Sequence, residues 1–278
     1  MRRLIVNADD FGFTAGVNRA IVEAHTHGIV TSATLMATGS AFDDAVSRAR
    51  RAPRLSVGCH VVLVDGRPVL DAAQLSSIAS ASASSVPADS GHPRFRHGLK
   101  SFAARALTGR LNPAEIEAET SAQIRKLQSA GVAVSHIDSH KHTHLVPGVF
   151  RAVVKLAGEF GIPWVRLPLD TTVRLGRLSV AFGNHYYRRF AAGKNVKLTD
   201  HFLGYRLTGS LTEATFAQAL RTIQDGTTEF MCHPGYLGDE LKRARTRLKE
   251  SRAKELAALI SPRIRQIISE RAIELGPC

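Results

Sequence analysis

Short apolar runs alternate with segments of helical spacing over the first 63 residues. The apolar runs at 4–6, 33–37 and 56–63 predict strands, and the segments at 15–28 and 42–49 place apolar side chains on one helical face. Strands that alternate with helices are typical of a parallel sheet covered by helices. The sequence therefore predicts an α/β fold with mostly parallel strands.

The rest of the chain continues this rhythm with two interruptions. We expect further helices and strands, at 114–130, 147–161, 163–169, 212–224, 229–233 and 250–275. Residues 65–110, with a Ser/Ala-rich run at 76–85, predict a mobile insertion, and residues 174–210 predict a lid or substrate-side insertion. The 278 residues suffice for one barrel-type domain, so we expect a single domain over 1–278.

The net charge and the cysteine content indicate which partners and which cellular compartment to expect. The formal net charge is +13 and predicts attraction to anionic surfaces. The basic residues are spread along the chain and accompany no nucleic-acid-binding motif, so we expect no nucleic-acid partner. The cysteines, Cys59, Cys232 and Cys278, are odd in number, which argues against a set of disulfides. We find neither a signal-peptide pattern nor a run of about 18 apolar residues, so we expect a cytoplasmic protein.

Residues 136–144 contain an alternating row of polar side chains. Every second position is a metal-capable residue: His136, Asp138, His140, His142 and His144. Because side chains alternate between the faces of a strand, we expect all five on one side of an extended strand that begins near Val132. The row is too long for a single ion, so at most two or three members can share one. The alternative is a solvent-exposed His-rich loop.

Polar clusters follow four predicted strands, at Asp9/Asp10, His60, 136–144 and His233. The carboxyl ends of parallel strands meet at one edge, where active sites gather. Taken alone, an Asp-Asp pair is often a helix cap, and a lone histidine is often a hydrogen-bonded core residue. Together, two imidazoles and a carboxylate can hold a divalent ion that activates water. A second carboxylate can then take a proton and a histidine can supply one to a leaving nitrogen.

The motifs at these strand ends resemble the YdjC/ChbG-type carbohydrate deacetylases. The resemblance spans nearly the whole chain and rests mainly on four segments: Asn7-Ala8-Asp9-Asp10-Phe11-Gly12, Gly58-Cys59-His60, His136-Ile137-Asp138-Ser139-His140-Lys141-His142-Thr143-His144, and Met231-Cys232-His233-Pro234-Gly235. It implies a distorted (β/α) barrel and metal-dependent removal of an N-acetyl group from an amino sugar. Within the family, the chain most resembles the hopanoid-biosynthesis-associated branch called HpnK, by its overall sequence and not by a single motif.

The resemblance also implies roles for individual residues. Asp10, His60 and His140 would bind a divalent metal ion, Mg²⁺ or Zn²⁺, while Asp9 would act as general base and His233 as general acid.

Three further residues of the His-rich segment acquire roles in the same way. His142 and His144 would line the sugar site, and Asp138 would orient the ligands. Cys59, where many relatives have an aliphatic residue, and the Ser/Ala-rich run depart from the family pattern. The departures leave the proposed ligands untouched but put the substrate range in doubt.

The branch resemblance implies a glycolipid substrate, an N-acetylglucosaminyl hopanoid. An Arg-interleaved apolar stripe at 174–192 would suit a helix in peripheral contact with an anionic membrane, although a core-packing helix with a basic outer face has the same pattern. A homodimer is compatible with the sequence. The rival functions are metal-dependent hydrolysis of another acyl ester or a phosphoester, and nucleic-acid binding by the basic surface with the His cluster as a structural element.

Overall fold

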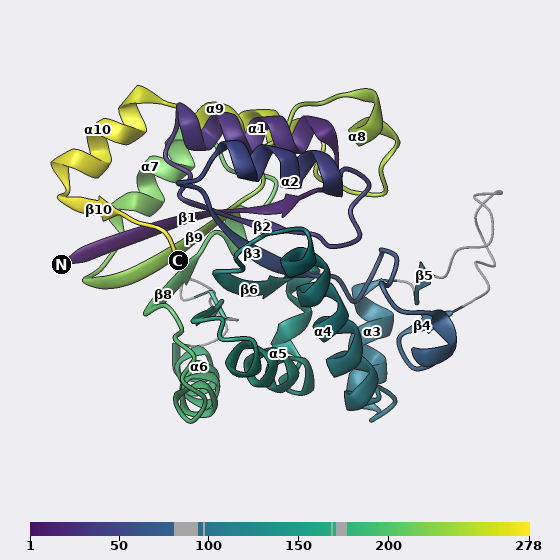
Figure 1. The fold of residues 1–278 in the computed structure, drawn as a ribbon. Helices are drawn as coiled ribbons and strands as arrows, with labels where there is room; N and C mark the ends of the chain where they lie inside the picture. Colours follow the sequence, from purple (N-terminus) through teal and green to yellow (C-terminus); the bar gives the residue numbers. More distant parts are fainter. Residues whose placement is uncertain (81–93, 97, 168, 171–176) are drawn as a thin grey trace.

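The computed structural model describes residues 1–80, 94–96, 98–167, 169–170 and 177–278, built around one parallel sheet (Figure 1). The strands lie in the order β7-β6-β3-β2-β1-β9-β8. Their bounds are β1 (Arg2–Phe11), β2 (Ser32–Leu35), β3 (Ser56–Val61), β6 (His136–Ser139), β7 (Trp164–Val165), β8 (His201–Leu203) and β9 (Gly226–Cys232). The central strand β1 is buried from Leu4 onward, because its apolar residues are covered on both faces.

The sheet curls until its two outer strands approach each other. Trp164 of β7 forms a parallel bridge with Lys197, which precedes β8. The amide of Val165 donates to the carbonyl of Lys197 at 3.0 Å, and the amide of Lys197 donates to Pro163 at 2.8 Å. A short strand β10 (Ile273–Leu275) pairs with the start of β1. The predicted fold, a distorted barrel of mostly parallel strands, is confirmed.

Helices lie around the outside of the curled sheet, with α1, α2 and α9 above the strands and α4 and α5 below them in Figure 1. The bounds are α1 (Ala15–Thr26), α2 (Phe42–Arg51), α4 (Pro113–Ser129), α5 (Pro147–Glu159), α6 (Arg177–Ala192), α7 (Glu213–Arg221), α9 (Glu250–Leu259) and α10 (Pro262–Glu270). The side chain of Thr14 caps α1 by accepting a hydrogen bond from the Val17 amide. Prolines begin α4 and α5, where the missing N–H costs no hydrogen bond. The helices predicted from apolar spacing are confirmed, and none of those described is long and apolar enough to cross a bilayer.

The His-rich segment is not one extended strand, and this prediction was wrong. β6 begins only at His136, and a 3₁₀ segment, η2 (His140–Leu145), follows it at once. Lys141 and His142 have positive φ angles of 53° and 52°, so the alternation of side chains ends there. The five metal-capable side chains therefore separate into different surroundings. The strand predicted at 163–169 is likewise shorter and covers only Trp164–Val165.

Several elements were not predicted from the sequence. They are η1 (Ala72–Gln74), an antiparallel pair of β4 (Ala79–Ser80) and β5 (Arg94–Phe95), α3 (Leu99–Leu107), β8, η3 (Tyr205–Leu207) and α8 (Asp239–Arg243). Within the predicted insertion at 65–110, the described parts thus contain regular structure, and residues 81–93 lie outside the described residues. In the predicted insertion at 174–210, residues 174–176 also lie outside the described residues. α6 forms the helix predicted from the apolar stripe at 174–192.

Candidate active site

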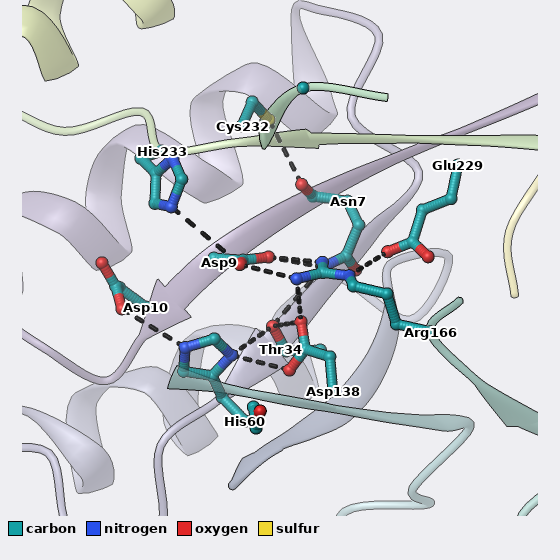
Figure 2. Close-up of polar contacts among 12 residues, drawn as sticks. Asn7, Asp9, Asp10, Thr34, His60, Asp138, Arg166, Glu229, Cys232 and His233 are labelled. Carbon is teal, nitrogen blue, oxygen red and sulfur yellow. Dashed lines mark hydrogen bonds and ion pairs between the residues drawn. The ribbon is translucent and has the colours of Figure 1, made fainter. Parts of the chain in front are cut away.

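Two adjacent carboxylates near the end of β1 enter different surroundings. Asp9 points into the barrel, whereas Asp10 has a φ angle of 66° at a point where the pairing of β1 with β2 shifts register. Both side chains are buried. Figure 2 shows Asp9 beside Arg166 and Asp10 beside His60.

Asp10, His60 and His140, the residues that the resemblance implies as metal ligands, lie close together. Oδ1 of Asp10 lies 3.1 Å from Nδ1 of His140 and 3.5 Å from Nε2 of His60. One ligand atom from each residue fits within a mutual separation of 4.8 Å. Ligand atoms so spaced can surround an ion at the usual bond lengths of about 2.0–2.2 Å. The donor set of two imidazoles and one carboxylate also suits a divalent cation.

Asp138 fixes the orientation of His60. Its Oδ1 lies 2.6 Å from Nδ1 of His60, and its Oδ2 accepts a hydrogen bond from the Thr34 hydroxyl at 3.0 Å. This contact leaves Nε2 of His60 facing Asp10. Burial lowers the pKa of His60, but the carboxylates of Asp138, Asp10 and Asp9 outweigh burial and raise it to about 10. A histidine whose second nitrogen binds a carboxylate is the usual arrangement of a metal ligand.

A buried arginine, Arg166, joins three carboxylates behind this cluster (Figure 2). Its guanidinium donates to both oxygens of Asp9 at 2.6 and 2.8 Å, to Glu229 at 2.7 Å and lies 2.7 Å from Asp138. Burial raises the pKa of Asp9, but the charge and hydrogen bonds of Arg166 dominate and hold it far below its usual range. Asp9 is therefore ionised and held in one orientation.

His233 approaches Asp9 from the end of β9. Its Nε2 lies 3.9 Å from Oδ2 of Asp9, and its backbone amide donates to Glu255 of α9 at 2.6 Å. Burial lowers the pKa of His233 to about 4 and raises the pKa of Glu255 to about 7. The imidazole is therefore neutral at pH 7 and directed toward the carboxylate predicted as a base.

A second arginine, Arg252 of α9, holds the far side of Asp10. Its terminal nitrogen lies 2.5 Å from Oδ2 of Asp10. Burial again raises the pKa of the carboxyl, yet Arg252 and the hydrogen bonds of His140 and His60 hold the pKa of Asp10 well below its usual value. Because Arg252 binds only Oδ2, Oδ1 still faces the two histidines.

His142 and His144 do not join the Asp10 cluster. η2 turns the His142 ring toward β8, where it lies 5.7 Å from Phe202 and 5.0 Å from Tyr205, measured between centroids, and the His144 ring lies 5.7 Å from that of His142. Burial lowers the pKa of both histidines, to about 3 for His144, so both are neutral. Nδ1 of His142 and Nε2 of His144 are buried and have no hydrogen-bond partner among the described residues.

Comparison with known proteins identifies the family of this chain. The profile of the YdjC-like proteins matches residues 3–270. The chain belongs to the YdjC-like family. A protein named carbohydrate deacetylase from Brevibacillus brevis is 35% identical over 98% of this chain and 97% of its own length. One of the same name from Geobacillus stearothermophilus is 34% identical over 99% and 96%.

Solved structures share the fold of this chain. A protein from Enterococcus faecalis V583, provisionally described as a cellobiose-phosphate cleavage protein, superposes with a TM-score of 0.80 at 27% identity and covers 99% of this chain and 97% of its own. An uncharacterized protein from Agrobacterium tumefaciens C58 has a TM-score of 0.51 at 12% identity, over 99% of this chain and 87% of its own. The second likeness concerns the fold alone.

Sequence reasoning missed the two arginines that organise this YdjC-like site. Arg166 could have been found, because it follows the apolar pair Trp164-Val165 at a strand end, and a buried guanidinium requires carboxylate partners. Arg252 gave no such signal, since arginines are common on helix surfaces. Glu229 and Glu255 were also missed as buried carboxyl groups.

Proposed function

We propose that this YdjC-like protein is a metal-dependent N-deacetylase that removes the acetyl group from an N-acetylated amino sugar. The observation that carries the proposal is the convergence of Asp10, His60 and His140 within 4.8 Å, beside an ionised carboxylate, Asp9, that takes no part in that cluster. The names of the relatives, carbohydrate deacetylase at 34–35% identity over nearly the full length, support the same reaction.

The metal would be held by Oδ1 of Asp10, Nε2 of His60 and Nδ1 of His140. A bound divalent ion, Mg²⁺ or Zn²⁺, supplies a Lewis acid and lowers the pKa of a bound water. A second group of metal-capable atoms, on Asp9, His60 and Asp138, is equally compact. It does not fit an ion, because Arg166 already neutralises both carboxylates and Nδ1 of His60 is bound to Asp138.

Asp9 and His233 would move the protons of the hydrolysis. Asp9 accepts a proton from the attacking water, and its basicity is limited by Arg166, so the proton passes on. His233 lies 3.9 Å away with a neutral ring, and it takes up this proton and donates it to the leaving amine. One proton thus travels from water to the sugar nitrogen, and the products are acetate and a free amine.

His142 and His144 would line the sugar site together with Tyr205. The support is the pair of buried ring nitrogens that lack a partner among the residues described, next to a half-exposed aromatic ring. Neutral imidazoles can donate or accept hydrogen bonds to sugar hydroxyls. The aromatic ring of Tyr205 offers an apolar face to a pyranose ring.

The reaction is tested by the product that it releases. We expect acetate and a free amine from N-acetylglucosamine oligosaccharides, measured by enzymatic acetate assay and by the loss of one acetyl mass in mass spectrometry. Chelator-treated protein should lose this activity and regain it when Zn²⁺ or Mg²⁺ is returned. Hydrolysis of p-nitrophenyl phosphate or p-nitrophenyl acetate without acetate release from the amide would instead support the rival hydrolase functions.

We further propose the narrower assignment to the hopanoid-associated HpnK branch, with an N-acetylglucosaminyl hopanoid as substrate at the surface of an anionic membrane. The support is the sequence resemblance, the net charge of +13 and an exposed aromatic side chain on α6, Phe182, which is 78% exposed with the exposed Arg189 on the same helix. The three free cysteines support a cytoplasmic location.

Liposome co-sedimentation tests the membrane contact. Phe182→Ser should weaken binding to vesicles that contain phosphatidylglycerol and leave activity on a water-soluble N-acetylated sugar intact. Equal sedimentation with neutral and anionic vesicles would contradict the preference for an anionic surface, and none with either would contradict the membrane contact itself. Neither result would affect the deacetylase proposal.

A further inference from the structure

A chain of polar contacts runs from two half-buried serines to the buried Asp9. The hydroxyl of Ser56 lies 2.7 Å from that of Ser135, which lies 2.8 Å from Nδ1 of His136. Nε2 of His136 lies 2.8 Å from Oδ1 of Asn7, whose Nδ2 donates to Asp9 at 3.0 Å. Asn7 is completely buried and His136 is 2% exposed. These residues come from β1, from the start of β3 and from the start of β6.

The chemistry of the groups fixes the direction of every hydrogen bond. An ionised carboxylate only accepts, so the NH₂ group of Asn7 must face Asp9 and its carbonyl oxygen must face His136. Nε2 of His136 therefore carries the ring proton, and Nδ1 accepts from the hydroxyl of Ser135. Burial and the charge of Arg166 lower the pKa of His136 to about 3, which agrees with a neutral ring. Each donor thus points toward Asp9.

Gly58 provides the space that the ring of His136 occupies. A Cβ atom at this position would lie 2.6 Å from Nδ1 and 2.7 Å from Cε1 of that ring, closer than such atoms approach. Gly58 belongs to the same short segment as the ligand His60. The absence of a side chain two residues before the ligand therefore has a defined steric reason.

We propose that His136 is a positioning residue that acts through Asn7 to hold Asp9 in its working orientation. The inference rests on the proposed function in one respect, the role of Asp9 as base. Without the Nε2–H donor of His136, the buried carbonyl oxygen of Asn7 loses its partner, and the amide is held only through its NH₂ group. The amide can then shift about its side-chain bonds, and the Asp9 carboxylate loses a donor in a fixed position.

The test compares two replacements of the imidazole. His136→Leu fills similar space without a donor, whereas the amide nitrogen of His136→Gln can reach the position of Nε2. We expect His136→Leu to lower kcat by about tenfold to a hundredfold, the cost of a misplaced catalytic group, with KM within a factor of about three. His136→Gln should restore most of kcat. Equal kcat in all three proteins would overturn the proposal, and so would equal losses in the two variants.

A double-mutant cycle with Asn7→Ala tests the route of the effect. If His136 acts through Asn7, then adding His136→Leu to Asn7→Ala should lower kcat by no more than about twofold further, because the two residues form one unit. Effects that multiply would contradict the proposal. The metal content of each variant should match that of the wild type, since neither residue belongs to the Asp10 cluster.

Nitrogen-15 NMR of the histidine-labelled protein gives a readout that needs no turnover. We expect His136 to be neutral, with its proton on Nε2 and slow to exchange with solvent, and this signal should vanish in His136→Gln. A proton on Nδ1 would overturn the hydrogen-bond chain even if every variant failed to fold. If the wild type showed the expected tautomer but released no acetate, the proposed function would fail while the chain itself stood.

Discussion

Two clusters of similar composition lie side by side at the end of the sheet. Asp10, His60 and His140 form one, and Asp9, His60 and Asp138 form the other, each with ligand atoms within 4.8 Å. In the second cluster, a buried guanidinium contacts both carboxylates directly, at 2.6 Å from Asp9 and 2.7 Å from Asp138. In the first, Arg252 contacts only the far oxygen of Asp10.

The difference between the clusters teaches that the position of the counter-charge decides which cluster is open to a cation. An arginine in a dry interior keeps its charge, and buried carboxylates are stable only when paired. Arg166 therefore converts the inner cluster into a fixed structure that presents an ionised carboxylate. The outer cluster keeps one carboxylate oxygen and two imidazole nitrogens turned toward each other, which is the arrangement that a metal ion requires.

The largest expected effects come from replacing Asp9 and His60, one in its role as base and the other in its role as metal ligand. Asp9→Asn should lower kcat by about 10²–10⁴-fold, the usual contribution of a general base, while the protein retains its metal. His60→Ala should lose the metal itself. Metal analysis of both purified variants, together with acetate release, checks this expectation. Equal metal loss in the two variants would show that the base and the ligand have been assigned to the wrong cluster.

Replacing Arg166 and Arg252 should lower the free energy of unfolding by different amounts. Arg166→Met leaves the buried carboxylates of Asp9, Asp138 and Glu229 without their guanidinium, and breaking such a pair costs about 3–5 kcal/mol in the free energy of unfolding. Arg252→Met should cost less, because it leaves only Asp10, whose charge a bound metal can compensate.

Urea unfolding with and without Zn²⁺ measures this difference between the arginine variants. Added metal should recover much of the stability of Arg252→Met and little of that lost in Arg166→Met. Full recovery of Arg166→Met by metal would contradict the idea that the inner cluster is closed to cations.

The smallest effect should come from Asp138, which touches both clusters. Asp138→Asn removes the charge behind His60 but keeps an oxygen that can accept from Nδ1. Loss of such an orienting carboxylate typically weakens metal affinity about 10–100-fold, so the variant should bind Zn²⁺ more weakly yet still bind it. Competition with a fluorescent zinc indicator measures the change, and an unaltered affinity would show that His60 needs no carboxylate to hold its orientation.

Sequence alone predicted parallel strands but not their order in the sheet, and it placed the polar clusters at the strand ends. Asp9, Asp10, His60 and His233 each follow an apolar run, and parallel strands bring such ends to one edge whatever the details of packing. The same local reasoning failed in the His-rich segment. Positive φ angles at Lys141 and His142 end the alternation of side chains between the two faces of the strand, and the pattern of residues did not predict that turn.

What the sequence by itself determined is therefore the α/β class and the meeting of acids and histidines at one edge, because both follow from local periodicity. Only the tertiary structure decided which carboxylate is neutralised and which side chains face one another. Arg166 lies 157 positions from Asp9, and Arg252 lies 242 positions from Asp10. Contacts over such separations depend on how the helices and strands pack, and charge pairing in a dry interior then fixes the chemistry that each group can perform.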